Sequence, residues 1–308
     1  MNENAVTIIR WANKCNNRCV MCSVHSGADR AEELTFEEAK EQIRKNAPDH
    51  RHIEFTGGEP TVREGVIDLI KFAKECGYKQ IGISTNGRRL ANKEYSDALV
   101  GAGLNYATIA VHGHDAETHE KMTDAKGSFE EGVQGIKNLL ATGATVSVAS
   151  VMNRFNHQTF HKIGELLLDI GVSFWAISDL IPDGRAKDIY EELCVSPREK
   201  EQSLLETVPV FMGVANVSIF NFPRCYLPQE LPKHVFFFDT KSKMELWNVK
   251  GVDGKYKKEG DVYQDVHKAY IPMCLDCSKY ESCGGFFKKE LELFGPEEAE
   301  GVARRNGF

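Results

Sequence analysis

The chain has 308 residues, of which 42% are hydrophobic and 27% charged, and its formal net charge is −7. The acidic balance argues against broad binding of nucleic acids or anionic membranes, because such proteins gather Lys and Arg against phosphates. No apolar run reaches the ~20 residues of a membrane-spanning helix, and the first residues do not resemble a signal peptide. We therefore expect a cytoplasmic protein, in which clustered cysteines bind metal or do redox chemistry more often than they form disulfides.

Six short β-type runs alternate with longer amphipathic segments, which predicts parallel strands joined by helical crossovers. The runs are VTIIRWA at 6–12, HIEF at 52–55, QIGIS at 80–84, YATIAV at 106–111, TVSVASV at 145–151 and SFWAIS at 173–178. The predicted fold class is α/β, with a partial (β/α)6 TIM barrel over residues 1–207, because eight complete units take ~250 residues. A doubly wound open sheet is the competing arrangement.

Helix boundaries are marked by capping signals. Capping-box spacing occurs at Thr35–Glu38, Ser128–Glu131 and Ser196–Glu199, and the last of these has Pro at the first helical position. Glycines suited to left-handed helix ends are Gly77, Gly103, Gly143 and Gly171.

The strand–helix rhythm stops after Val208. Four prolines interrupt helix formation in the next 25 residues, and residues 235–249, VFFFDTKSKMELWNV, are typical of a β-hairpin. We expect residues 208–308 to form a smaller, cysteine-rich domain, near the size at which a metal site helps to stabilise a fold.

Three cysteines stand within eight residues, directly after the first predicted strand: Cys15, Cys19 and Cys22. Structural zinc usually takes four ligands from paired C-x2-C elements, whereas here three thiols come without a fourth nearby. A [4Fe–4S] cluster held at three irons leaves one iron open to another ligand. The carboxyl end of a β/α-barrel strand is also where active sites lie.

The C-x3-C-x2-C spacing resembles the signature of the radical S-adenosylmethionine (SAM) superfamily. Two further motifs that resemble this family follow the second and third strands, Thr-Gly-Gly-Glu-Pro at 56–60 and Ser-Thr-Asn-Gly at 84–87. The resemblance spans roughly residues 6–185 and implies that SAM chelates the open iron. It departs from the family at Met21, where an aromatic residue near adenine is common. The SAM-binding residues that it implies are Met21, Thr56, Gly57, Gly58, Glu59, Pro60, Ser84, Thr85, Asn86 and Arg185.

A second cysteine set lies near the end of the chain, where Cys274, Cys277 and Cys283 precede Gly-Gly-Phe-Phe. It resembles the twitch or SPASM extensions of radical SAM enzymes, which hold auxiliary [4Fe–4S] clusters, and the shorter twitch version is the better match. Cys225 completes the set by elimination, because Cys76 and Cys194 are interpreted as structural. A structural zinc site is the alternative, since four thiolates also coordinate zinc.

Two loops carry further polar residues. His112, His114 and His119 lack a matched metal-ligand spacing, so we predict a polar active-site loop after the fourth strand. The loop after the sixth strand, residues 183–185, is either a plain turn or a contact to the SAM carboxylate or substrate.

The resemblance implies an enzyme of the oxidoreductase or maturase type. A reduced cluster would cleave SAM to a 5′-deoxyadenosyl radical, which would abstract hydrogen from a substrate carbon; a flavodoxin- or ferredoxin-type protein would supply the electron. The expected substrate is a peptide, or else a small polar metabolite. The alternatives are a twitch-class sugar or aminocyclitol dehydrogenase or epimerase, a nucleotide-rearranging enzyme of cofactor biosynthesis, and, outside enzymes, an iron–sulfur electron carrier or zinc-stapled binding protein.

Overall fold

The computed structural model describes residues 6–24, 26, 33–227, 231–238, 246–247, 249–250, 256–257 and 267–308. Its main sheet contains eight parallel strands that lie side by side in chain order, and a two-residue strand flanks the first of them. These are β1 Val6–Ala12, β2 His52–Gly57, β3 Gln80–Thr85, β4 Tyr106–Ala110, β5 Thr145–Val151, β6 Phe174–Ser178, β7 Asn216–Phe220, β8 Val235–Phe238 and the flanking β9 Leu246–Trp247.

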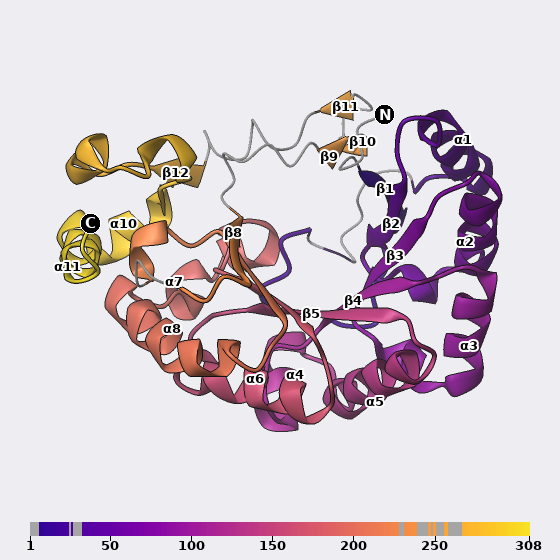
Figure 1. The fold of residues 1–308 in the computed structure, drawn as a ribbon, viewed down its shortest axis with the longest axis horizontal. Helices are drawn as coiled ribbons and strands as arrows, with labels where there is room; N and C mark the ends of the chain where they lie inside the picture. The colour runs from indigo at the N-terminus through magenta and orange to yellow at the C-terminus, as the bar shows by residue number, and fades with distance from the viewer. Residues whose placement is uncertain are drawn as a thin grey trace.

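The strand order distinguishes the two predicted arrangements. A doubly wound sheet reverses its strand order at a switch point, whereas β1 to β8 run in one direction without reversal. Right-handed crossovers in one direction put the helices on a single face, and Figure 1 shows them along the outer side of the curved sheet. The partial TIM-barrel prediction is confirmed.

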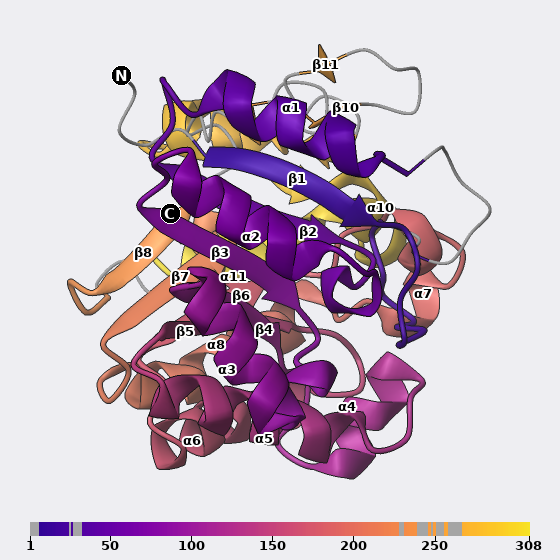
Figure 2. The same cartoon turned by 90° about the vertical axis from the view of Figure 1, so that its right-hand side faces the viewer.

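The helices alternate with the strands. They are α1 Phe36–Asn46, α2 Val66–Glu75, α3 Lys93–Ala102, α4 Ala116–Thr123, α5 Ser128–Ala141, α6 Phe160–Asp169, α7 Tyr190–Leu193, α8 Pro197–Phe211, α10 Lys288–Phe294 and α11 Pro296–Arg305. Short 3-10 helices are η1 Pro60–Val62, η2 Arg88–Ala91, η3 His157–Thr159, η4 Gly184–Lys187, η5 Arg224–Tyr226, η6 Pro272–Asp276 and η7 Tyr280–Ser282. Figure 2 shows α1, α2 and α3 in succession beside β1 to β3. None of the described helices is long and apolar enough to cross a bilayer.

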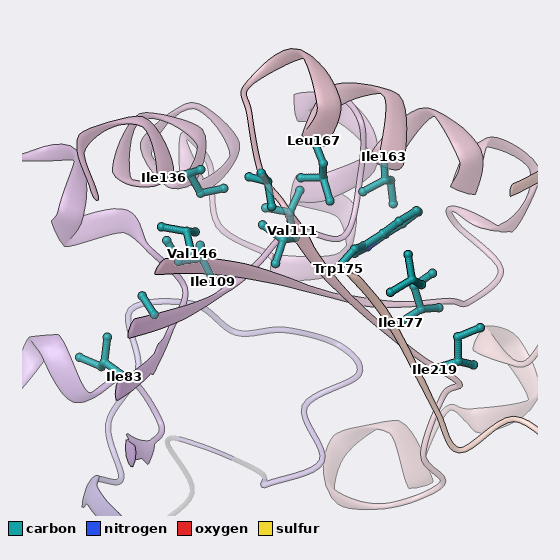
Figure 3. Packing of buried hydrophobic residues seen from close by; sticks show 14 of the residues in the cluster. Ile83, Ile109, Val111, Ile136, Val146, Ile163, Leu167, Trp175, Ile177 and Ile219 are labelled. Atoms are coloured by element: carbon teal, nitrogen blue, oxygen red, sulfur yellow. The ribbon is translucent and has the colours of Figure 1, made fainter. Parts of the chain in front are cut away.

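The hydrophobic core lies between the sheet and the helices. Alternate strand residues such as Ile109 and Ile177 are fully buried there, against Ile136 and Ile163 from the helices (Figure 3). Trp175 stacks on Phe160 with their ring centroids 5.5 Å apart. Because strand side chains alternate in direction, the residues between these core positions face the inner side of the sheet.

Most of the predicted caps are confirmed. Thr35 and Ser196 both form capping boxes, and the four predicted glycines have positive φ at helix ends. The capping box at Ser128 is wrong, because the helix already begins at this residue and Gly127 precedes it. The Ser128 hydroxyl instead hydrogen-bonds the Thr123 hydroxyl at 2.7 Å.

The hairpin predicted for residues 235–249 is also wrong. β8 pairs in parallel with β7, and β9 pairs in parallel with β1, so both segments extend the main sheet. Residues 239–245 and 248 lie outside the described part of the chain. The remaining strands are short antiparallel pairs, β10 Val249–Lys250 with β11 Tyr256–Lys257 and β12 Lys268–Ala269 with β13 Phe286–Phe287. The domain division at residue 207 stays a prediction; α8 spans this position.

Candidate functional site

The cysteine loop, residues 13–24, follows β1 at the carboxyl edge of the sheet and carries Cys15, Cys19 and Cys22. The amides of Arg18 and Val20 donate hydrogen bonds of 2.9 Å each to carbonyls at the end of α4. The Cys22 thiol lies 3.3 Å from the Ser26 hydroxyl. The loop is therefore held by backbone bonds to a neighbouring crossover rather than standing free in solvent.

Two glycines bring the turn after β2 against the cysteine loop. The amide of Gly58 donates to the Ala12 carbonyl at 2.5 Å, and that of Glu59 to the Lys14 carbonyl at 2.8 Å. A Cβ on Gly57 would stand 2.2 Å from the Ala12 oxygen, and one on Gly58 would stand 2.4 Å from the Lys14 oxygen. The resemblance implied that Gly57 and Gly58 bind SAM; in the structure, the atoms that leave no room for a Cβ at these positions belong to the chain itself.

Glu59 joins the turn after β2 to the turn after β3. Its carboxylate is fully buried and accepts hydrogen bonds from the Thr61 amide and hydroxyl, the Thr85 hydroxyl at 2.8 Å and the Asn86 amide at 2.7 Å. Burial raises the pKa of Glu59, and these hydrogen bonds partly offset the rise. Glu59 thus fixes the position of the Ser-Thr-Asn segment as well as its own turn.

The turn after β3 also contacts the cysteine loop. The Asn86 side-chain amide lies 3.8 Å from the Cys15 sulfur and donates to the Asn16 side-chain oxygen at 2.7 Å. Arg88 donates to the Asn16 carbonyl at 2.6 Å. The sequence did not predict a role for Arg88, because a bond to a backbone carbonyl leaves no pattern in the sequence. Ser84 faces the inner side of the sheet, where its hydroxyl donates to Glu54 at 2.6 Å.

Arg185 contacts the backbone of the cysteine loop. Its amide donates to the Cys22 carbonyl at 3.0 Å, and its guanidinium donates to the carbonyls of Cys19 and Ser26. Gly184 permits this approach, because a Cβ there would lie 2.2 Å from the Cys22 oxygen. Arg185 therefore holds the cysteine loop, and its contact with SAM stays a prediction.

The chemistry of the three thiols fits an iron–sulfur cluster. Burial raises the pKa of Cys15, and burial followed by the neighbouring thiols of Cys15 and Cys22 raises the pKa of Cys19 to about 12. Such thiols become thiolates when bound cations compensate their charge. Within the described residues, no three His, Cys, Asp or Glu side chains gather closely enough for one metal ion. A cubane cluster avoids that requirement, since each thiolate binds its own iron.

Met21 lies within the cysteine loop, and His112 and His119 lie between β4 and the end of α4, the helix to which this loop is hydrogen-bonded. Met21 is buried in a small apolar cluster with Met122, Leu180 and Tyr190, so its packing near adenine stays a prediction. His112 and His119 are buried and stacked, with ring centroids 5.9 Å apart. The His112 amide donates to Nδ1 of His119 at 3.1 Å. Burial lowers the pKa of both imidazoles, so both are neutral near pH 7.

The C-terminal cysteines gather around η5, η6 and η7. Cys225 lies in η5, Cys274 lies in η6, and Cys277 and Cys283 follow η6 and η7. Burial raises the pKa of Cys225, and the thiols of Cys283, Cys274 and Cys277 raise it further in that order. The structure therefore brings the four predicted ligands into one neighbourhood. Phe286 packs beside this set, with its ring 5.7 Å from that of Tyr226.

A buried ionic network connects the C-terminal segment to the barrel. Lys200 on α8 contacts Asp179 after β6 at 2.7 Å and also contacts Glu290 on α10. The Tyr226 hydroxyl donates to Glu290 at 2.5 Å. All four side chains are buried. Since Tyr226 directly follows Cys225, the network fixes the position of this cysteine relative to the carboxyl edge of the sheet.

Comparisons with known proteins agree with this geometry. Residues 9–170 match the family model described as the Radical SAM superfamily. An "AdoMet-dependent heme synthase" of Nitratidesulfovibrio vulgaris is 30% identical over 202 residues, which cover 64% of this chain and 54% of the relative. A "Probable GTP 3′,8-cyclase" of Saccharolobus islandicus is 29% identical over 181 residues, or 58% of each chain. The chain thus matches little more than half the length of these relatives.

Solved structures share the fold over a larger part of the chain. "Native anSMEcpe with bound AdoMet" has a TM-score of 0.67 at 13% identity, covering 99% of this chain and 96% of its own. SuiB of Streptococcus suis, "bound to precursor peptide SuiA", has a TM-score of 0.62 at 12% identity, covering 96% of this chain and 74% of its own. At these identities the likeness concerns the fold alone.

Proposed function

This chain belongs to the radical SAM superfamily, and on that premise we propose that it is a radical SAM enzyme of the oxidoreductase or maturase type that modifies or oxidises a peptide. The observation that carries the proposal is the meeting of three segments at the carboxyl edges of β1, β2 and β3. There the cysteine loop, the Gly-Gly-Glu turn and the Ser-Thr-Asn turn are hydrogen-bonded to one another. Active sites of β/α barrels lie at this edge.

Cys15, Cys19 and Cys22 would hold a [4Fe–4S] cluster, and residues 56–60 with Thr85 and Asn86 would bind SAM. When bound, the cluster and SAM supply one-electron reductive cleavage of SAM and removal of hydrogen from a substrate carbon, giving methionine and 5′-deoxyadenosine. The chain itself orients this site. Glu59 and Arg185 hold the surrounding turns in place, and the three cysteines are partly exposed at this edge of the sheet.

We propose that Cys225, Cys274, Cys277 and Cys283 hold an auxiliary [4Fe–4S] cluster. Support comes from their mutual electrostatic influence and from the absence, among the described residues, of a donor set tight enough for one metal ion. A single Zn²⁺, with Zn–S distances of ~2.3 Å, requires such a tight set. We expect about eight iron atoms per chain after anaerobic reconstitution; about four iron plus one zinc would assign the second site to zinc.

We propose a peptide as the substrate by analogy, because one solved structure of the same fold, SuiB, is bound to a precursor peptide. The peptide-bound SuiB structure covers 96% of this chain. The heme synthase relative matches 64% of this chain, and the GTP cyclase relative matches 58% of it. A nucleotide substrate is the second candidate, favoured by the GTP cyclase match. A flavodoxin- or ferredoxin-type protein is the proposed electron donor.

The test is anaerobic incubation of the reconstituted protein with SAM and dithionite. We expect 5′-deoxyadenosine to form, Cys19→Ala to abolish it, and Cys76→Ala to leave it unchanged, because Cys76 caps α2 and belongs to neither cysteine set. Cys277→Ala should retain SAM cleavage and lose about half of the iron. If iron-replete protein forms no 5′-deoxyadenosine, the proposal fails.

A further inference from the structure

The inner face of the sheet carries mostly small and polar side chains, with Ile8, Arg10, Tyr106 and Phe174 as larger exceptions, where a closed barrel carries bulky ones. In a closed TIM barrel this face is filled by layers of Val, Ile and Leu. Here most of the residues between the core positions of β2 to β7 remain partly exposed, Gly82 and Ser147 being buried, which means that solvent reaches parts of the inner face. The partly exposed residues include Thr56, Ser84, Thr108, Ala149, Ala176 and Ser218.

Glu54 is the only carboxylate among the inner-face positions of β1 to β8 as described. It lies between Ile8 of β1 and Gly82 of β3 in the strand register. The Ser84 hydroxyl donates to its Oε1 at 2.6 Å. A Cβ on residue 82 would stand 2.5 Å from Oε2, so Gly82 provides the room for this second oxygen.

Oε2 of Glu54 can accept hydrogen bonds from a ligand. In the described part of the chain no group donates a hydrogen bond to Oε2, and no Lys or Arg forms an ion pair with this carboxylate. Burial raises the pKa of Glu54, and the Ser84 hydroxyl partly lowers it. A partly buried carboxylate such as that of Glu54 is most favourable when a cation compensates it through charge-assisted hydrogen bonds.

Glu54 lies on β2 near the proposed SAM site, further from the carboxyl end of the strand. It precedes Thr56 by two residues on β2, a rise of about 7 Å along the strand, and its partner Ser84 begins the Ser-Thr-Asn segment. A group bound at Oε2 would therefore lie on the inner face, close to the edge where hydrogen is removed. A triphosphate would be repelled by this carboxylate, whereas an ammonium or guanidinium would be attracted.

We infer that Glu54 binds a cationic group of the substrate, an ammonium or guanidinium, and selects it over neutral and anionic groups. This inference rests on the proposed function and narrows its substrate class to basic peptide side chains or amino-substituted small molecules. Ser84 would orient the carboxylate, and Gly82 would keep Oε2 accessible.

The test compares probes that differ in charge on the reconstituted enzyme with SAM, by anaerobic equilibrium dialysis. Nα-acetyl-L-lysinamide should bind about tenfold or more tightly than Nα-acetyl-L-norleucinamide, as charge-assisted hydrogen bonds allow. Tighter binding of 2-deoxystreptamine than of the lysine probe would assign the cation to an aminocyclitol instead of a peptide. Either preference supports the inference.

Variants separate this role from a structural one. Glu54→Gln keeps an oxygen for Ser84 and should lose the preference for the cation, whereas Glu41→Gln, exposed on α1, should keep it. Gly82→Ala should weaken binding of the lysine probe with Glu54 still present. No preference in the wild type, or an unchanged preference in Glu54→Gln, overturns the inference. The 5′-deoxyadenosine assay on the same sample tests the proposed function separately.

Discussion

Replacing Gly58 with alanine tests whether the contact between the turn after β2 and the cysteine loop determines the site. The new Cβ would stand 2.4 Å from the Lys14 oxygen and 2.6 Å from the Asn13 oxygen, both backbone atoms that cannot rotate away. Gly58 does not have a positive φ, so the steric contact is the whole perturbation. Overpacking costs about 1–3 kcal/mol, and losing the Gly58–Ala12 hydrogen bond adds about 1 kcal/mol. We therefore expect the free energy of unfolding to fall by about 2–4 kcal/mol.

The control is Gly101→Ala. Gly101 lies in the last turn of α3 with no atom within 4 Å of a new Cβ, so this variant should gain about 0.5–1 kcal/mol from helix propensity. Urea denaturation of the apo-protein measures both changes, and iron content after reconstitution measures the effect on the cluster site. We expect Gly58→Ala to retain less iron as well. If Gly58→Ala stays within 1 kcal/mol of the wild type with full iron content, the reasoning about this contact is refuted.

Three further predictions concern the groups around the site. Arg185→Met should lower the iron bound at the N-terminal site, because the cysteine loop loses its guanidinium contacts; Lys187→Met, exposed on the same 3-10 helix, should bind iron normally. Lys200→Met should lower the free energy of unfolding in urea by about 3–5 kcal/mol, since two buried carboxylates lose their cation. The exposed Arg198→Met should lower it by less than about 1 kcal/mol. A loss as small as this for Lys200→Met would contradict the prediction. Burial lowers the pKa of His112 from 6.5 to about 3. The unfolded chain therefore binds the extra proton, and stability that is complete above pH 6.5 is lost as the pH falls toward 3, by up to about 1.4 kcal/mol per pH unit. His112→Gln apo-protein should show a shallower slope between pH 6 and 4.5, and an unchanged slope would argue against a buried neutral imidazole.

The sequence predicted the six barrel strands because their signal is local. Alternation of buried and partly exposed residues, as along β2, follows from side chains pointing to opposite faces. The pairing of β8 could not be predicted in the same way. The run VFFF indicates a strand, but it does not show which strand is its neighbour. The pairing of β8 with β7 depends on how the whole sheet curves, which is a non-local property.

In the candidate site, too, local patterns were predictable from the sequence and long-range contacts were not. The spacing of Cys15, Cys19 and Cys22 indicated their chemistry without a structure. The residues that hold their loop, Arg185 and Arg88, form bonds to backbone carbonyls, which leave no pattern in the sequence. Gly57 and Gly58 were recognised as part of a motif, but a missing Cβ does not identify the atom that takes its place.

The central claim is that three cysteines hold a cluster whose fourth iron is open to SAM. It is tested most directly by electron–nuclear double resonance of the dithionite-reduced protein with SAM labelled with ¹⁵N at its amino group. We predict ¹⁵N coupling to the cluster signal in the wild type and in Cys277→Ala, and no such signal in Cys19→Ala. A cluster spectrum that SAM leaves unchanged, without ¹⁵N coupling, would contradict the account.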